Sequence, residues 1–199
     1  MNAFPPTEVT LKDGRSALVR AATPDDAPAL SAHLRSLAGE APYICMTPGE
    51  VSSDERLREE IMELRERPGS LVLLGEAEGR VVGDCWMTAM SPVKMRHVGR
   101  IGMAIAEGWR GVGLGRALLA PIVEHARTHP AILRLELDVF ERNAGAIRLY
   151  ESLGFVREGL RPARFRQDDG ALLADVSMGM WVGPDPAPSD HSVRASATR

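Results

Sequence analysis

The segment "EGWRGVGLGRALLAPIVEHAR", from Glu107 to Arg127, joins a glycine-rich turn to a helical run. Its core "RGVGLG" places Gly111, Gly113 and Gly115 directly before an amphipathic pattern. Glycine disfavours helices, and its missing Cβ lets another group approach the backbone closely. A helix N-terminus also exposes unpaired N–H groups that carry partial positive charge. The segment therefore predicts an anion site, suited to a pyrophosphate, where this helix begins.

Two common phosphate motifs do not fit this turn. A P-loop would continue with Gly-Lys-Ser/Thr, whereas the chain continues with "GRA". A dinucleotide fingerprint reads G-x-G-x-x-G, whereas the spacing here is G-x-G-x-G behind Arg110. The alternative without a ligand is a tight strand-to-helix turn. The motif thus favours another diphosphate or a purely structural turn.

The rest of the chain predicts further strands and helices around this turn. Hydrophobic periodicity, caps and Gly/Pro signals indicate hairpins at 9–23 and 70–90, strands at 97–107, 133–139 and 172–182, and helices at 23–38, 52–67, 114–129 and 143–154. Alternating strands and helices in the second half imply at least one parallel strand pair. The fold class is α/β (α+β), with a mixed sheet flanked by helices.

Composition narrows the classes of partner and compartment. The chain has 199 residues, 44% of them hydrophobic, and a formal net charge of -3, which suits one globular domain without a nucleic-acid or membrane partner. No apolar run approaches the roughly 18 residues of a spanning helix. The N-terminus shows no signal peptide, so we expect a cytoplasmic protein. Cys45 and Cys85 fit neither a disulfide framework nor a zinc site, and we expect both to be reduced and buried.

The domain boundaries follow from where these patterns stop. We expect a flexible N-terminus at 1–8 and a single domain at 9–182. Residues 183–199 are polar, carry prolines and lack aromatic side chains, which predicts a disordered tail.

Two ordered motifs make the chain resemble the GCN5-related N-acetyltransferase (GNAT) superfamily. "IGMAIAEGWRGVGLGRALL" resembles its acetyl-CoA motif, a strand followed by Arg/Gln-x-x-Gly-x-Gly/Ala, through Arg110, Gly113 and Gly115. "LELDVFERNAGAIRLYESLGF" resembles the next motif through Asn143, Tyr150 and the Gly-Phe pair. The resemblance runs from about residue 9 to 182. It implies a mostly antiparallel sheet whose central parallel strand pair is splayed.

The resemblance also implies roles for single residues. A bulge near the end of the motif strand would expose backbone groups of Met103, Ala104 and Ile105 to the pantetheine arm and thioester of acetyl-CoA. Asn143 would be a second cofactor contact, although it is also an ordinary helix cap. Tyr150 would give a proton to the departing thiolate, against the alternative of a packed core aromatic. The pyrophosphate would lie on Arg110, Gly111, Val112, Gly113, Leu114, Gly115 and Arg116.

The implied activity is acetyl-CoA-dependent N-acetylation of a primary amine by direct attack. The acceptor would be a small amine, of amino acid or polyamine type, or a protein N-terminus; a homodimer is compatible with the family. A catalytically silent acyl-CoA sensor or structural module is the alternative. The base that deprotonates the amine stays open among His97, Glu136, Asp138, Asp84 and water.

The acceptor site is expected between the first two helices and the loop "GEAPYICMTPGE". Tyr43, Ile44 and Met46 could form an apolar wall there, and Glu40 and Glu50 could attract a cationic amine; a loop that packs into the core is the alternative. The pair His125 and His129 has metal-ligand spacing, but an exposed helix face explains it better, and we expect no metal.

Overall fold

The computed structural model describes residues 4–38, 46–167 and 169–184. Its strands are β1 (Thr7–Thr10), β2 (Ser16–Ala21), β3 (Leu71–Ala77), β4 (Arg80–Ala89), β5 (Val98–Ile105), β6 (Arg134–Phe140), β7 (Val156–Arg166) and β8 (Leu172–Trp181). Its α-helices are α1 (Ala27–Ala38), α2 (Asp54–Glu66), α3 (Leu114–Thr128) and α4 (Ala144–Ser152). Short 3-10 turns include η1 (Pro24–Asp26), η2 (Pro48–Glu50) and η4 (Glu107–Trp109).

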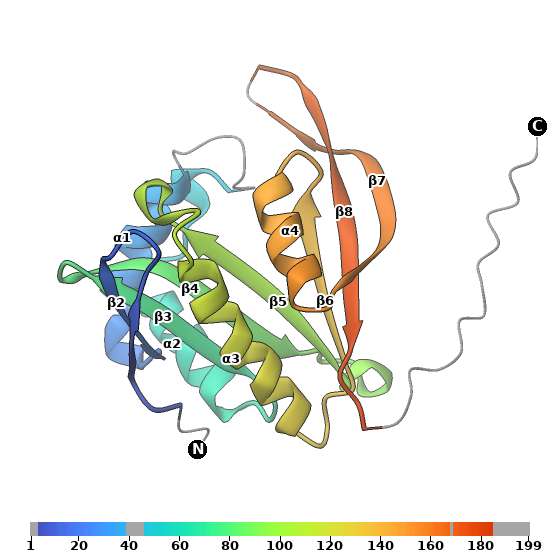
Figure 1. Ribbon diagram of the computed structural model, residues 1–199, viewed down its shortest axis with the longest axis horizontal. Helices are drawn as coiled ribbons and strands as arrows, with labels where there is room; N and C mark the ends of the chain where they lie inside the picture. Colours follow the sequence, from blue (N-terminus) through green and yellow to red (C-terminus); the bar gives the residue numbers. More distant parts are fainter. Residues whose placement is uncertain (1–3, 39–45, 168, 185–199) are drawn as a thin grey trace, which may run out of the picture.

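The strands form one mixed sheet in the order β1-β2-β3-β4-β5-β6-β8-β7 (Figure 1). β5 and β6 are parallel, because α3 carries the chain back between them, and the other neighbours are antiparallel. This arrangement confirms the predicted mixed, mostly antiparallel sheet with a central parallel pair.

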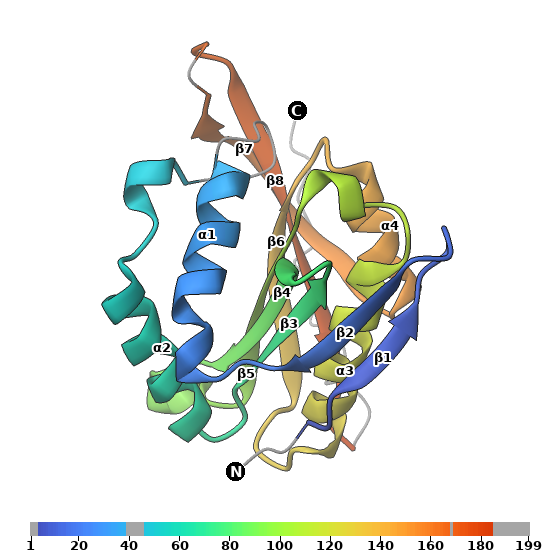
Figure 2. The same cartoon turned by 90° about the vertical axis from the view of Figure 1, so that its left-hand side faces the viewer.

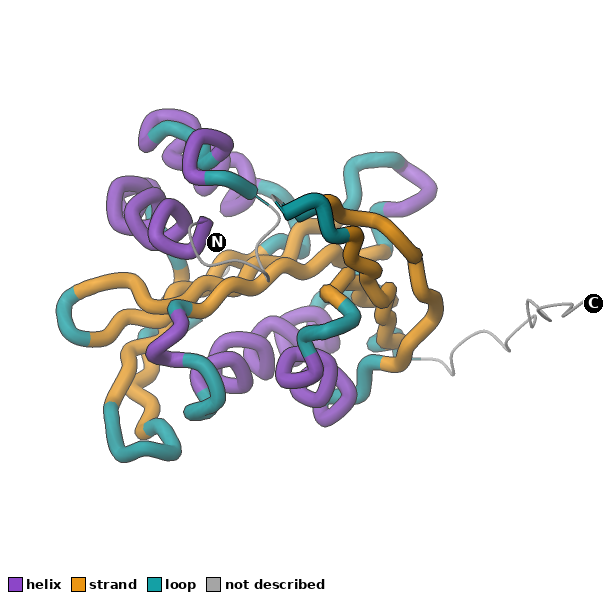
Figure 3. The backbone as a smooth tube through the Cα atoms, turned by 90° about the horizontal axis from the view of Figure 1, so that it is seen from above, coloured by secondary structure: helices purple, strands orange, loops and turns teal. Residues whose placement is uncertain are grey.

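The helices cover both faces of the sheet. α1 and α2 lie on one face, and α3 and α4 lie on the other (Figures 2 and 3). Each face has its own core: the larger one packs α3 and α4 against the sheet, and the smaller one packs α1 and α2 around Leu57, Leu74 and Val81. The sheet therefore separates two layers of packed side chains.

The sequence analysis missed one strand, β7. This strand pairs only with β8, so it lies at the edge of the sheet, and most of its side chains are exposed. It carries several arginines, and its pairing register shifts between Arg161 and Phe165, around Pro162 and Ala163. An exposed, bulged, proline-bearing edge has no alternation of apolar and polar residues, which is the signal that predicts strands.

The described residues extend past both ends of the predicted domain. β1 begins at Thr7, two residues ahead of the predicted domain start at residue 9. The predicted disordered tail lies outside the described residues except for Gly183 and Pro184. Cys85 is a free, buried thiol as predicted, and burial raises its pKa well above the ordinary value; Cys45 lies outside the described ranges. Within those ranges, no helix is both long and apolar enough to traverse a bilayer.

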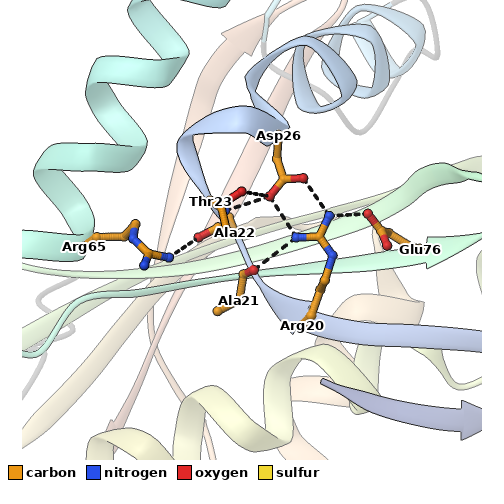
Figure 4. A network of polar contacts seen from close by, with 7 residues as sticks. All are labelled: Arg20, Ala21, Ala22, Thr23, Asp26, Arg65 and Glu76. Carbon is orange, nitrogen blue, oxygen red and sulfur yellow. Dashed lines mark hydrogen bonds and ion pairs between the residues drawn. The ribbon is translucent and has the colours of Figure 1, made fainter. Parts of the chain in front are cut away.

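An ion-paired network fixes the entry into α1 (Figure 4). Arg20 on β2 donates to both carboxylate oxygens of Asp26, at 2.6 and 2.8 Å, and also pairs with Glu76 on β3. The Thr23 amide donates to Asp26 at 2.7 Å. Arg65 reaches over from α2 to a backbone carbonyl of the same segment. The start of α1 is thus bound to two strands and to α2.

The carboxylate of Asp26 links this network to the pH dependence of protein stability. Burial opposes its ionisation, but hydrogen bonds from Arg20 and Thr23 outweigh burial and lower the pKa of Asp26 to about 2. Because the folded pKa lies below the ordinary value of 3.8, the stabilisation is complete above pH 4 and is lost as pH falls towards 2. We expect Asp26→Asn to lower the free energy of unfolding at pH 7 by roughly 2 kcal/mol.

Urea unfolding between pH 7 and pH 2 measures this difference. The gap between wild type and Asp26→Asn should shrink as the pH approaches 2. Asp25→Asn is the matched control, because Asp25 is 91% exposed and pairs only at the surface with Arg58. Equal stability of the two variants at pH 7 would contradict the structural role of the network.

Candidate active site

The central feature of the site is a divergence of β5 from β6. β5 pairs with β4 without interruption from Gly99 to Ile105, but it pairs with β6 only from Val98 to Arg100. Beyond Arg100 the two parallel strands separate, and Figure 1 shows them close at one end and apart at the other. Residues 101–105 therefore have a hydrogen-bonded neighbour on one side only.

The alternation of the antiparallel ladder identifies which backbone groups face the gap. The Ala106 amide donates to Val82 of β4 at 3.0 Å, so even-numbered residues of β5 direct their N–H and C=O groups towards β4. Ala104 therefore bonds to β4, whereas Met103 and Ile105 direct their backbone groups away from β4, towards the gap. Of the three residues predicted to contact the cofactor through their backbone, two therefore face the gap and Ala104 does not.

The expected bulge is not present in this part of the structure. The register between β4 and β5 advances without a shift, so the prediction of a bulge was wrong. The divergence from β6 exposes the backbone in its place. The Ile105 carbonyl accepts a hydrogen bond from Arg110 Nε at 2.8 Å, which leaves the N–H and C=O of Met103 as backbone groups that point into the gap.

The glycine turn follows β5 and η4 and opens α3. Gly111 has φ 76° and Gly113 has φ 105°, left-handed values that side chains rarely adopt. Gly113 caps α3, and its carbonyl accepts from the amides of Arg116 and Ala117, both at 3.1 Å. The amides ahead of Arg116 lie at the open end of the helix, as in an anion site.

Arginine side chains hold this turn from both sides. Arg110 bonds to β5 as described, and Arg116 donates to Ser152 Oγ on α4 at 2.6 Å. In this structure both predicted phosphate ligands therefore also connect the turn to its neighbours.

The N-terminal hairpin contributes neighbours that the sequence analysis missed. The Lys12 amide donates to the Val112 carbonyl at 2.9 Å, and the Lys12 side chain is 3.7 Å from where a Cβ on Gly113 would lie. The Arg15 guanidinium lies 3.8 Å from the ring centroid of the buried Trp109. These contacts join segments that are about 100 residues apart in the sequence, and a local sequence pattern cannot predict contacts at that distance.

Close packing between α3 and α4 places the second motif. A Cβ on Gly115 would lie 2.9 Å from Leu149 Cδ2, so glycine permits the two helices to approach. Asn143 caps α4 by accepting from the Ala146 amide at 3.1 Å. Tyr150 is 6% exposed and lies edge-on to Phe155 at 5.9 Å.

The environment of Tyr150 keeps its phenol protonated. Burial, followed by the neighbouring Cys85 thiol, raises the pKa of Tyr150 well above its ordinary value. Cys85 pairs in register with Met103, so Tyr150 and the gap share the α3 side of the sheet. The buried phenol is thus a hydrogen-bond donor on the α3 side of the gap.

The predicted base candidates lie in different surroundings. His97 is exposed ahead of β5, and Glu136 pairs with Arg134 at 2.8 Å. Burial acts against ionised Asp138, but hydrogen bonds from Arg161, Arg100 and Ser177 outweigh it and lower its pKa. Both carboxylates are thus engaged by arginines, and the lowered pKa makes Asp138 a poor proton acceptor.

Asp84 differs from the other candidates. Its Oδ1 lies 3.4 Å from Nε2 of His33 on α1, and the two side chains are 6% and 1% exposed. Neither atom makes a hydrogen bond, because 3.4 Å exceeds the usual distance and the geometry is poor. A buried polar atom without a partner costs about 1–3 kcal/mol. The sequence analysis named Asp84 but not His33, which lies about 50 residues earlier.

The predicted acceptor loop falls mostly outside the described residues, including Glu40, Tyr43 and Ile44. Met46 is half-buried, and Glu50 is exposed and accepts a hydrogen bond from Thr47 in the turn η2.

The predicted histidine pair lies towards the end of α3. His125 is half-buried and not exposed as predicted, and burial, followed by the neighbouring His129, lowers the pKa of His125. Among the described residues, no group of three or more His, Cys, Asp or Glu side chains could hold a metal ion.

Known proteins resemble this chain in sequence and in fold. A model of the "Acetyltransferase (GNAT) family" matches residues 34–155, more than half of the chain. This chain belongs to the GNAT acetyltransferase family. An acetyltransferase of this family from Streptococcus pneumoniae has a similar structure, with a TM-score of 0.79 and 27% identity over 83% of this chain and 99% of that chain.

Two other known proteins are similar to this chain. The L-amino acid N-acetyltransferase AaaT of Escherichia coli (strain K12) is 32% identical over 96 residues, which are 48% of this chain and 59% of AaaT. The match therefore spans less than two thirds of AaaT. The acetyltransferase yncA from Salmonella typhimurium, whose structure contains its cofactor acetyl-CoA, shares the fold with a TM-score of 0.75 and 22% identity, over 86% of this chain and 97% of that chain.

Gly113 offers a direct test of the GNAT cofactor turn. We expect Gly113→Asp to weaken acetyl-CoA binding by at least about 100-fold, because a carboxylate at the helix N-terminus would repel phosphate. Isothermal titration calorimetry measures the dissociation constant. Gly79→Asp is the matched control, since Gly79 has φ 73° and open space around it in the β3–β4 turn. Unchanged affinity in folded Gly113→Asp would contradict the assignment.

Proposed function

We propose that this chain is an acetyl-CoA-dependent N-acetyltransferase that modifies a primary amine. The observation that carries the proposal is the divergence of β5 from β6 directly ahead of the glycine turn. Unpaired strand backbone and an open helix N-terminus then follow each other along the chain. This order suits a ligand with an amide-bearing arm at one end and a pyrophosphate at the other.

The residues at the site fit acetyl-CoA. Gly111 and Gly113 form a cradle that any Cβ would strain, and the first amides of α3 would hold the pyrophosphate. Met103 would pair with the pantetheine arm through its backbone, and Ala104 and Ile105 would continue this contact along β5. The further ligands would be Arg110, Val112, Leu114, Gly115, Arg116 and Asn143. Lys12 lies beside Gly113 and adds a cation to this end.

The proposed chemistry is direct transfer. Acetyl-CoA supplies the thioester, and the amine attacks its carbonyl carbon, so that a C–N bond forms and the C–S bond breaks. The Met103 N–H would donate to the carbonyl oxygen, a type of contact that is often worth about 2.7–4 kcal/mol. Tyr150 would donate to the sulfur as negative charge develops there. The buried phenol carries the proton that the thiolate would take.

We place an amino acid first among the acceptors, ahead of a polyamine or a protein N-terminus. The sheet face under α1 presents charges of both signs, with Arg100 bound to Asp138 at 2.7 Å and Arg161 bound to Asp138 at 2.6 Å. An amino acid carries one charge of each sign and could exchange with such pairs. The partial similarity to AaaT supports the same class.

The proposal includes a cytoplasmic location and a homodimer. For the dimer, the edge strand β7 offers a surface on which Val156 is 60% and Leu160 is 52% exposed. A silent CoA sensor is the competing function. The buried phenol of Tyr150 beside the gap favours the enzyme, because a sensor has no need for a proton donor there.

Release of the CoA thiol from acetyl-CoA tests the proposal against a panel of amino acids, polyamines and N-terminal peptides. We expect one amine class to cause turnover. With that amine, Tyr150→Phe should lower kcat by about 100-fold or more, as removal of a general acid does, and should leave acetyl-CoA affinity unchanged.

Thr128→Ala is the matched control, because it also removes one helix hydroxyl, at the end of α3 opposite the glycine turn. No turnover with any amine, despite tight acetyl-CoA binding, would favour the sensor. Full activity of Tyr150→Phe would contradict the role given to this residue and leave the transferase intact.

A further inference from the structure

The pair His33 and Asp84 is an exception in the way this protein treats buried charge. Asp175 is 1% exposed, and Arg161 donates to it, with one bond at 2.9 Å. Asp26 and Asp138 are likewise hydrogen-bonded by arginines. Asp84 Oδ1 and His33 Nε2 face each other without a hydrogen bond. Buried polar atoms left in this state mark positions where another polar group completes the bonding.

The pair lies next to the proposed reaction centre, on the side away from the cofactor turn. Asp84 is opposite Ala104 in the β4–β5 register, and paired residues direct their side chains to the same face. That face is covered by α1, which carries His33. The neighbouring residues Met103 and Ile105 direct their side chains to the other face, against Gly115 of α3. An amine that enters from the α1 face would meet the pair beside the gap.

Several other charged groups on the elements around the pair have charged partners. On β2 and β3, Arg20 pairs with Asp26 and Glu76, and on β5 Arg100 pairs with Asp138. Between α1 and α2, Asp54 Oδ1 lies 3.9 Å from Arg35 and also lacks a hydrogen bond, but the Asp54 side chain is 44% exposed. The titratable neighbour within β4 is the Cys85 thiol, which belongs to the α3 side. The pair is thus the available proton acceptor beside Ala104.

We propose that His33 and Asp84 act together as the proton acceptor for the attacking amine. This inference rests on the proposed transferase function. An amine that arrives as an ammonium ion loses one proton to the pair, directly or through one water molecule. The accepted proton then lies between His33 Nε2 and Asp84 Oδ1, the two facing atoms that otherwise lack a hydrogen bond.

The protons balance over the reaction. The freed nitrogen lone pair forms the C–N bond, and the C–S electrons leave with the sulfur, which takes the Tyr150 proton. The second proton that the nitrogen loses restores the phenol through solvent. The proton held by His33 and Asp84 then leaves to water, so one proton is released for each acetylated ammonium ion.

Single and double substitutions test the pair. Asp84→Asn and His33→Gln should each lower kcat/KM at neutral pH by about 100-fold or more and leave acetyl-CoA affinity unchanged. The loss should shrink as pH rises, because the fraction of free amine increases about tenfold per pH unit below the pKa of the amine. The double variant should lose little more than either single one, since the two groups act as a unit.

Ser31→Ala is the matched control. Ser31 is also on α1 and fully buried, and its hydroxyl makes no hydrogen bond to Asp84 or His33. We expect this variant to retain the wild-type pH profile. Thermal melting of every variant identifies any that does not fold. If one of the two single variants fails to fold, the pH profile of the other one tests the inference.

The outcomes separate this inference from the function on which it rests. If the wild type is active and folded Asp84→Asn and His33→Gln keep its pH profile, the proton-acceptor role of the pair is wrong and the transferase function stands. Equal loss at every pH, together with lower melting temperature, would indicate a structural role and also overturn it. A wild type that is silent with every amine would overturn the transferase and the proton acceptor together.

Discussion

The backbone of β5 beyond Arg100 has a hydrogen-bonded neighbour on one side only, and this constraint organises the rest of the molecule. A buried strand with open N–H and C=O groups is costly unless another polar partner takes them. β4 holds the other side of β5 over seven residue pairs, from Gly83↔Ile105 to Ala89↔Gly99, so the strand stays in place. α3 and α4 pack on one face of the gap and α1 on the other. The opening is therefore held by the fold around it.

The two helical layers place different chemical groups on the two sides of the gap. On the α3 side lie the glycine turn, the capped helix α4 and the buried phenol of Tyr150. On the α1 side lie Asp84, His33 and the charged side chains of β5, β6 and β8. An arm with a diphosphate suits the first side, and a charged acceptor suits the second. The gap is where a bond between them could form.

Much of this could be predicted from local sequence. Gly113 and Gly115 precede a helical pattern, Asn143 precedes another, and the alternation around Leu135 predicts a strand with one buried face. Such signals depend on near neighbours along the chain. β7 was missed because it is an arginine-rich edge, and His33 was missed because its partner Asp84 is on a distant strand. The missing bulge reflects a strand that separates from one neighbour while its pairing with the other stays regular.

Amide hydrogen exchange by NMR, with and without acetyl-CoA, tests the central claim most directly. The Met103 amide points into the gap, whereas the adjacent Ala104 amide bonds to β4. Fast exchange at Met103 in the free protein, slowed strongly by acetyl-CoA while Ala104 stays protected throughout, is the result that the account predicts. If Met103 is already protected in the free protein, or if saturating acetyl-CoA leaves its exchange unchanged, the gap is not the binding site.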